Sequence, residues 1–131
     1  MISDTGGQRG STAVEYAIVL PALLMFILGL IDSGRLLWTY TALSRSVEAA
    51  ARCAAINTTI CGSTSAIQSY AVGQAWGLPV TSSAYSVTAP ACGEQVAATL
   101  TFNFVIPWFY GTAPFGSANA ITLNPVSCYP T

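Results

Sequence analysis

The first half of the chain contains a long run of apolar residues. From Ala17 to Ile31 no residue is charged, and counting back to Val14 only Glu15 interrupts the apolar character. A membrane-spanning helix needs about 20 mostly apolar residues, with a lower limit of about 17. An acidic group at the bilayer centre costs roughly 2.5–3.5 kcal/mol, so Glu15 has to lie close to one membrane surface. The run therefore predicts a membrane helix over about residues 14–31.

The helical pattern continues beyond this run as a narrower apolar stripe with the spacing of a coiled-coil seam. Its members are Leu36, Tyr40, Leu43, Val47, Ala50 and Ala54. On another face, Arg45, Glu48 and Arg52 have the spacing at which opposite charges pair. We expect one long helix over residues 11–55, kinked at Pro21 because proline frees a backbone carbonyl inside the helix.

The remainder of the chain predicts a short helix followed by strands. Ser65 to Gln68 match a capping box, which starts a helix that runs to about Trp76 and that Gly77 and Pro79 end. Apolar and polar residues then alternate, as in half-buried strands, at 85–89, 95–106 and 120–128.

These elements predict an α+β fold, in which residues 56–131 form a small domain after the long helix. The strands form a three-stranded antiparallel meander, and the middle strand has a clear apolar face. That face carries Val96, Ala98, Leu100, Phe102, Phe104 and Ile106. Pro125 lacks a backbone N–H, which confines the last strand to a sheet edge or a bulge. The end of the long helix that carries small side chains is the available partner for the apolar face.

Charged side chains are scarce, and their scarcity excludes several classes of function. They make up 7 % of the chain, the net charge is −1, and there is no His and no Lys. Without a basic patch, nucleic acid is not an expected partner. Without His or Lys, general-base and Schiff-base chemistry lack their usual side chains, and Asp32, Glu48 and Glu94 are widely spaced. We expect a protein that is not an enzyme and that holds no cofactor and no metal.

Four cysteines form an even set, at Cys53, Cys61, Cys92 and Cys128. A zinc site would need all of them at unusual spacing, so disulfides and an oxidising compartment are the better interpretation. Four cysteines allow three connectivities. We favour Cys53–Cys61, which closes a short loop after the long helix. We also favour Cys92–Cys128, which joins the ends of antiparallel neighbours if Pro125 shifts the side-chain parity of the last strand.

The residues before the apolar run match a processing signal. Gly10 is followed by Ser-Thr-Ala-Val-Glu-Tyr and then by the apolar helix. This arrangement resembles the type IV prepilin signal, in which a hydrophilic leader ends in Gly and the fifth residue after it is Glu. With Leu20-Pro21 and the helix exit Ile31-Asp32-Ser33-Gly34-Arg35, the segment from Arg9 to about Arg45 resembles the TadE-like pseudopilins of tight-adherence (Flp) pili.

The resemblance implies a role for each of these residues. Residues 1–10, which are polar and Gly-rich and are expected to be disordered, would be a leader that a prepilin peptidase removes between Gly10 and Ser11. Glu15 and Tyr16 would serve assembly, with Glu15 pairing to the amino terminus of a neighbouring subunit. Partners would then be the peptidase, other pilin subunits, the pilus assembly machinery and the cytoplasmic membrane.

The function implied is that of a minor pilin or pseudopilin in pilus assembly and surface adherence. Such a protein sits in the cytoplasmic membrane with its C-terminal domain outside and then enters an extracellular filament. The alternative is a single-pass anchored extracytoplasmic binding module that never enters a filament. Flanking arginines do not decide the orientation, since Arg9 precedes the helix and Arg35 and Arg45 follow its membrane part.

Three adjacent aromatic residues, Trp108, Phe109 and Tyr110, follow Pro107 at the end of the middle strand. They cannot all face one core. Either one of them folds back onto the sheet or helix, or they form an exposed apolar contact tip for another subunit or a surface.

Overall fold

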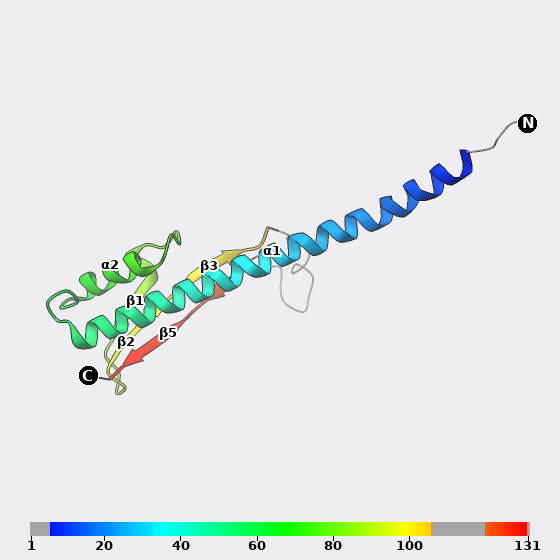
Figure 1. The fold of residues 1–131 in the computed structure, drawn as a ribbon. Coiled ribbons are helices and arrows are strands. Elements are labelled where there is room, and N and C mark those ends of the chain that lie inside the picture. The colour runs from blue at the N-terminus through cyan, green and yellow to red at the C-terminus, as the bar shows by residue number, and fades with distance from the viewer. Residues whose placement is uncertain (1–5, 106–119, 131) are drawn as a thin grey trace, which may run out of the picture.

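The chain folds into one long helix with a small group of helices and strands packed along its C-terminal half (Figure 1). The computed structural model describes residues 6–105 and 120–130. The elements are α1 (Gly6–Ile56), α2 (Thr64–Gln74), the 3-10 turn η1 (Ser82–Ala84), β1 (Tyr85–Thr88), β2 (Glu94–Ala98), β3 (Leu100–Asn103), β4 (Ala120–Leu123) and β5 (Val126–Tyr129). We call residues 57–105 and 120–130 the head. This arrangement confirms the predicted α+β class.

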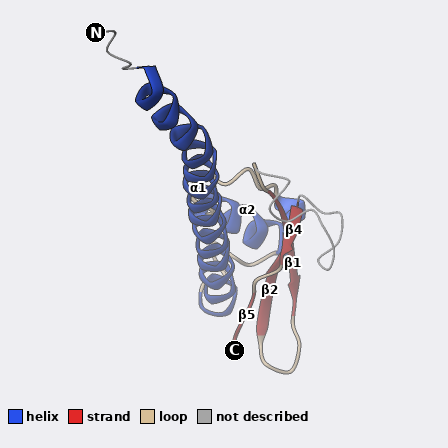
Figure 2. Cartoon of the chain, turned by 90° about the vertical axis from the view of Figure 1, so that its right-hand side faces the viewer, coloured by secondary structure: helices blue, strands red, loops and turns tan. Residues whose placement is uncertain are grey.

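Helix α1 is longer than predicted at its N-terminal end. It extends from Gly6 to Ile56, 51 residues or about 76 Å at 1.5 Å per residue. The prediction of a disordered leader is therefore wrong for Gly6 to Gly10. Extending an existing helix avoids the cost of nucleation, so residues of low helix propensity such as glycine can continue it at its end. The helix continues through Pro21, and Figure 2 shows its N-terminal part leaning away from the line of the rest.

The C-terminal half of α1 carries the core that the head packs against. Members of the predicted stripe are buried at Leu43, Val47 and Ala50 and partly buried at Leu36 and Ala54. Tyr40 was predicted to belong to it but is 47 % exposed. The buried face turns instead through Ala42, Ser46 and Ala51. An α-helix repeats every 3.6 residues, so a stripe with a strict heptad period drifts off the buried face.

Small side chains bring α2 close to α1. Ala50 and Ala51 on α1 and Ala71 and Ala75, on and next to α2, are no more than 1 % exposed. Both helices cover the same face of the strands, since α1 contacts β2 and β5 while α2 contacts β1 (Figure 2). The predicted packing of the strands on this part of the long helix is therefore confirmed.

Helix α2 begins and ends slightly earlier than predicted. Its N-cap is Ser63, whose Oγ accepts a hydrogen bond from Ala66 N at 3.3 Å. The predicted capping box at 65–68 is wrong, because Gln68 Nε2 donates to the carbonyl of Tyr85 at 2.7 Å instead of capping the helix. The helix ends at Gln74 because the chain then turns left-handed at Trp76, where φ is 47°.

The strands reproduce the predicted alternation. Val96, Ala98, Phe102 and Phe104 are buried and Leu100 is partly buried, whereas Thr99, Thr101 and Asn103 on the other face are exposed. Ile106 lies outside the described residues. Strand β2 is the centre of a three-stranded antiparallel sheet in the order β1-β2-β5, and its continuation β3 pairs antiparallel with β4.

The last two strands follow β2 and β3 in one continuous register. Ala97 pairs with Val126 and Leu100 pairs with Leu123, so both strands advance by the same number of positions across Pro125. Pro125 therefore forms no bulge and shifts no parity, which corrects that part of the prediction. Its missing N–H interrupts the ladder only locally, and its carbonyl still accepts from Ala98 N at 3.0 Å. The edge position predicted for β5 is confirmed.

A buried polar pair joins α1 to β1. Tyr85 is 2 % exposed, and its hydroxyl lies 2.9 Å from Ser46 Oγ. Because Ser46 Oγ donates to the carbonyl of Leu43 at 2.8 Å, the Tyr85 hydroxyl is the donor between the two side chains. Desolvation by burial raises the pKa of Tyr85 above its ordinary value.

Candidate membrane and assembly site

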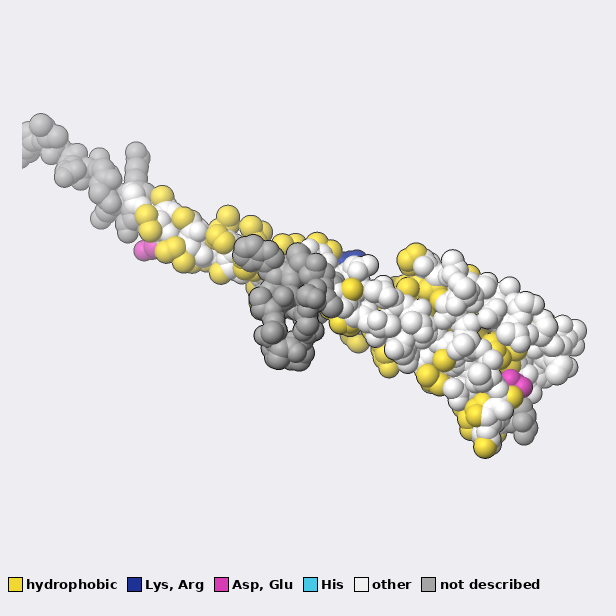
Figure 3. Space-filling model, turned by 180° about the vertical axis from the view of Figure 1, so that it is seen from behind, with side chains coloured by type: hydrophobic (Ala, Val, Ile, Leu, Met, Phe, Trp, Pro, Cys, Tyr) yellow, Lys and Arg dark blue, Asp and Glu magenta, His cyan; other side chains and the backbone are white. Residues whose placement is uncertain are grey.

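The N-terminal half of α1 presents large apolar side chains to its surroundings. Between Val14 and Ile31 these side chains are from 43 % to 71 % exposed. The most apolar window of the helix has a mean hydropathy of 2.4, and none of that window is buried. We call residues 14–31 of α1 the apolar stalk, and Figure 3 shows hydrophobic side chains along its visible face. A helix that is apolar all round belongs in a bilayer or a helix bundle, and this one is long enough to serve as a single-pass membrane anchor.

Glu15 and Tyr16 lie at the beginning of this apolar surface, and both side chains are exposed. Along the helix axis, Glu15 is about 24 Å from Ile31 at 1.5 Å per residue. The carboxylate is therefore at the end of the apolar surface that is remote from the head, where its neighbours in a bilayer or bundle come from outside this chain.

The bond between Gly10 and Ser11 lies within the first turns of α1. Gly10 is exposed, and a Cβ added to it would meet no heavy atom within 4 Å. Its backbone does not have the left-handed conformation that favours glycine. Nothing in the described fold therefore requires a glycine at this position.

A buried carboxylate links the head to α1 at the end of the exposed apolar surface. Asp32 is 1 % exposed, and its Oδ1 accepts from Arg35 Nη1 at 2.9 Å. Its Oδ2 accepts from the backbone N–H of Val105 at 2.9 Å, just beyond β3. A buried carboxylate is tolerated only when it is paired and hydrogen-bonded, and here both oxygens have partners. We call this arrangement the Asp32 junction.

Aromatic rings complete the Asp32 junction. The guanidinium carbon of Arg35 lies 5.4 Å from the ring centroid of Phe102, within the range of a cation–π contact. The ring of Phe102 in turn meets Phe104 edge to face, with centroids 5.2 Å apart. Arg35 is thus held between Asp32 and Phe102, and it orients the carboxylate that holds Val105.

Sequence reasoning missed this junction. It placed Asp32 and Arg35 in the helix exit but treated the carboxylates as isolated. The spacing of Asp32 and Arg35 at i, i+3 was the available signal for the ion pair. The hydrogen bond to Val105 had no local signal, because 73 positions separate the two residues.

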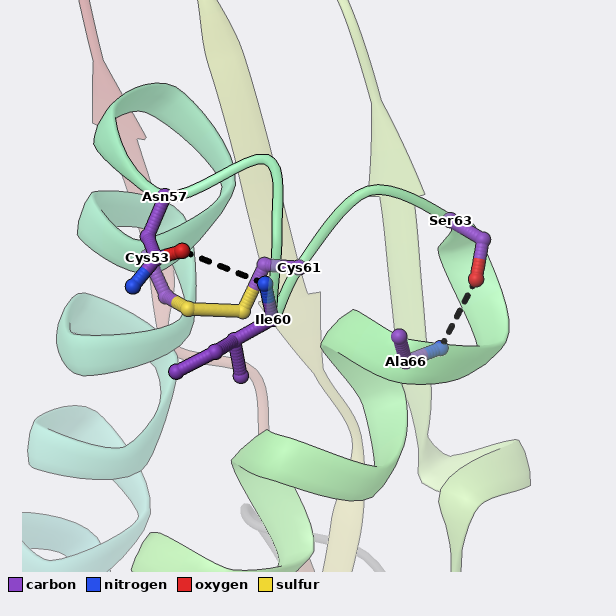
Figure 4. Close-up of a disulfide and its surroundings, with 6 residues drawn as sticks. All are labelled: Cys53, Asn57, Ile60, Cys61, Ser63 and Ala66. Atoms are coloured by element: carbon purple, nitrogen blue, oxygen red, sulfur yellow. Dashed lines mark hydrogen bonds between the residues drawn. A yellow bond between two sulfur atoms is a disulfide. The ribbon is translucent and has the colours of Figure 1, made fainter.

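The first disulfide joins Cys53 in α1 to Cys61 and closes the loop between the two helices (Figure 4). Within the loop, the Asn57 side chain accepts from Ile60 N at 3.1 Å, which substitutes for a backbone turn. The disulfide and this side-chain bond together fix how the chain leaves α1 and enters α2.

The second disulfide joins Cys92, in the turn before β2, to Cys128 in β5. In the register of the sheet Cys128 lies opposite Gln95, so the bond reaches Cys92 through the turn at Gly93 and not through a shifted parity. Gly93 has φ 119°, and a side chain on it would run into the carbonyl of Tyr129. The two disulfides are the pairs that we favour from the sequence.

Other predicted features have different outcomes. The contact tip at Trp108, Phe109 and Tyr110 lies outside the described residues. The pairing predicted among Arg45, Glu48 and Arg52 is wrong, since in the described part of the chain the ion pair shorter than 4.0 Å is the one in the Asp32 junction. Over the same residues, no group of three or more His, Cys, Asp or Glu side chains could hold a metal ion.

A comparison with known protein families gives a match to the N-terminal part of the chain. Residues 10–52 match the family model described as TadE-like protein. The match begins at Gly10 and ends within α1, and it confirms the resemblance found from the sequence. Searches of curated proteins and of solved structures gave no match.

Proposed function

We propose, starting from the TadE-like character of residues 10–52, that this protein is a minor pilin or pseudopilin of a Tad (Flp) pilus. The match indicates a protein associated with Tad pili, and the finer role rests on the shape of α1. The observation that carries it is the uncovered apolar half of that helix, which continues without a break into the half that holds the head. A filament subunit needs such a helix twice, first as a membrane anchor and then as a surface for neighbouring subunits.

Leader removal is the first step of the proposed function. A prepilin peptidase would cut between Gly10 and Ser11, at the first residue of the family match. The support from the structure is that no packing contact or backbone conformation explains Gly10. A residue that the fold does not need is a candidate for recognition by an enzyme.

The head would lie outside the cytoplasmic membrane. Two disulfides support this orientation, because disulfides form and persist in oxidising compartments. After assembly the same head would lie on the outside of an extracellular filament and serve surface adherence.

The decisive experiment is to determine the N-terminus of the full chain extracted from membranes of cells that make an active prepilin peptidase. We expect a mature chain that begins at Ser11, measured by intact mass and N-terminal sequencing. A Gly10→Leu variant is the matched control and should retain residues 1–10. If the unchanged chain also keeps Met1 to Gly10, the pilin proposal is wrong, and the anchored binding module is the better interpretation.

Glu15 separates filament assembly from simple anchoring. Cleavage creates an amino group at Ser11, and an incoming subunit would pair its Glu15 with that group on a neighbour, since a carboxylate inside an apolar bundle is tolerated only when paired. Glu15→Gln should stay inserted, because a neutral amide is cheaper to bury, but it should enter sheared pili less. Glu15→Leu should insert at least as well and assemble no better.

The readout is the ratio of protein in sheared pili to protein in the membrane fraction. A plain anchor predicts that neither change is harmful in any assay. Normal incorporation of both Glu15 variants into pili would therefore exclude the pairing role.

A further inference from the structure

Two depressions lie in line where α1 borders α2. The larger has a volume of about 520 Å³ and is lined by α1 from Arg45 onward and by Tyr70 of α2. The smaller, of about 100 Å³, is lined by Trp38, Thr41, Ala42, Arg45 and Trp76. Because Arg45 lines both, the two depressions are adjacent along α1, and we call them together the α1–α2 groove.

The groove gathers most of the charge of a nearly uncharged region. Beyond Arg35 the charged residues of the whole sequence are Arg45, Glu48, Arg52 and Glu94, and all of these except Glu94 line the groove. Arg45, Glu48 and Arg52 are exposed and form no ion pair shorter than 4.0 Å in the described structure. The groove therefore has two arginines against one glutamate, and it complements an acidic partner.

Exposed aromatic rings flank these charges. Trp38 is 62 % exposed and Trp76 is 72 % exposed. Trp76 also has a left-handed backbone with φ 47°, a conformation that glycine or asparagine adopts at lower cost. A bulky side chain kept exposed on a strained backbone needs a reason outside the fold, and Trp, Tyr and Arg are the residues that dominate the cores of protein interfaces.

A second copy of this chain is a poor occupant. Pairing the same groove from two copies would bring Arg45 and Arg52 of each copy near those of the other, and like charges across an interface cost affinity. Nucleic acid is also a poor occupant, because its affinity grows with the number of phosphates neutralised and the groove offers two cations. A protein segment that carries carboxylates fits both the charge and the aromatic rings.

The shape of that segment follows from the helix that the groove continues. Leu24, Ile31, Trp38, Arg45 and Arg52 are spaced seven residues apart along α1, so they follow a stripe that winds around the helix by about 20° per heptad from the apolar stalk into the groove. Leu24 and Ile31 are half-exposed. Next to the stripe, a Cβ added to Gly34 would meet nothing within 4 Å, so the fold does not need this glycine, whereas a second helix packing closely would use it.

We propose that the α1–α2 groove receives a helix of a different pilus subunit, which leaves the membrane alongside α1 and places carboxylates opposite Arg45 and Arg52. The two arginines are two helical turns apart, about 10.5 Å, so the partner's carboxylates have a similar spacing. Trp76 and Tyr70 close the far side of the groove over the partner helix. This proposal rests on the proposed function, because it assigns a kind of partner and a place to a pilus subunit.

The test uses the full chain in its native membrane, with a photoreactive amino acid in place of Ala49, which lines the groove. The control carries the same group at Thr101, on the exposed face of β3. We expect an adduct from position 49 and not from position 101, and mass spectrometry should identify a different membrane protein. The linked peptide should come from a segment that follows a membrane helix and carries two carboxylates about two turns apart.

Charge and shape variants decide whether the groove makes the contact. Arg45→Glu with Arg52→Glu should reduce the adduct at least about tenfold, while Arg45→Lys with Arg52→Lys should retain most of it. Trp76→Asn should weaken the adduct and leave the thermal stability of the head equal or higher, because asparagine tolerates the left-handed backbone. Disulfide mapping of each variant verifies that the head has folded.

Each contrary result overturns the proposal. These results are an adduct with a second copy of this chain, an adduct that charge reversal leaves unchanged, and the absence of any adduct from position 49. Leader cleavage is measured in the same sample. An uncleaved chain that gives the expected adduct would contradict the pilin proposal alone, and a cleaved chain without the adduct would contradict the groove proposal alone.

Discussion

The two halves of α1 have the same secondary structure but opposite relations to the rest of the chain. Before Asp32, the large apolar side chains are exposed and the described head covers none of the most apolar window. After Asp32, one face is buried, and most of its buried side chains are small, such as Ala50 and Ala51. Helix propensity does not explain this difference. The head packs only on the part of α1 that follows Asp32, and the Asp32 junction marks the beginning of that contact.

The largest expected effect tests how much a disulfide within the head contributes to its stability, compared with the disulfide that begins in α1. Replacing Cys92 and Cys128 by Ser removes a link across 36 positions and should lower the free energy of unfolding by about 4 kcal/mol. The same change at Cys53 and Cys61, which are 8 positions apart, should cost about 2.5 kcal/mol. Denaturant titration of the full chain in detergent measures both. Equal losses would contradict the loop-closure explanation.

A matched pair of leucines tests the comparison directly. Leu43→Ala removes a fully buried side chain and should destabilise the head by about 3 kcal/mol. Leu24→Ala, in the apolar stalk, should leave head stability unchanged and alter membrane insertion by less than about 1 kcal/mol. Thermal unfolding followed by near-ultraviolet circular dichroism gives the first quantity, and membrane-fraction levels give the second. A stability loss at Leu24 would mean that the stalk also packs against the head.

The boundary between the halves is tested at Asp32. Asp32→Asn keeps the shape but removes the charge that strengthens the bonds to Arg35 and Val105, which should cost about 2 kcal/mol. Amide hydrogen exchange at Val105 should accelerate while exchange in β2 stays slow. Ser33→Ala is the control, since the Ser33 hydroxyl donates within α1, to the carbonyl of Gly29. Unchanged exchange at Val105 would show that the carboxylate does not hold the strand.

The smallest effect concerns the polar contact inside the core. Tyr85→Phe should cost about 1 kcal/mol at neutral pH, since Ser46 keeps its bond to the Leu43 carbonyl. Burial raises the pKa of Tyr85, so the folded state favours the neutral phenol. Its contribution is complete below the unfolded pKa of about 10 and is lost as the pH rises through the folded pKa. The unchanged protein should therefore lose stability more steeply than Tyr85→Phe above about pH 10. Parallel alkaline curves would contradict this account.

Local periodicity predicted most of the elements but not the contacts that join them. The alternation from Val96 to Phe104 identified the buried face of the middle strand, because side chains in a strand alternate strictly. Ser63 was missed as the N-cap because several serines stand close together and the choice depends on the turn that precedes the helix. The register across Pro125 and the bond from Asp32 to Val105 depend on how distant segments meet, and no local pattern encodes that.

In the candidate site, too, some residues could be identified from the sequence and some contacts could not. Gly10, Ser11, Glu15 and Tyr16 were predicted by resemblance, and their roles remain predictions because they concern an enzyme and neighbouring subunits. The groove residues Arg45 and Arg52 were expected to pair with Glu48. In the described structure neither arginine forms an ion pair with Glu48, because helical spacing allows such a pair but does not fix the direction of the side chains.

Helix α1 continues without a break from the apolar stalk into the part that carries the head, so a tilt of the stalk also moves the head. From Asp32 to Ile56 the helix extends about 37 Å, without a hinge that would let the head move independently. Membrane helices tilt by about 20° on average, and such a tilt carries the far end of this arm about 13 Å sideways. A small change in how the stalk is seated is therefore magnified at the end of the molecule that lies farthest from it. The position of the distal surface of the head would therefore report the surroundings of an apolar surface that the described head does not cover.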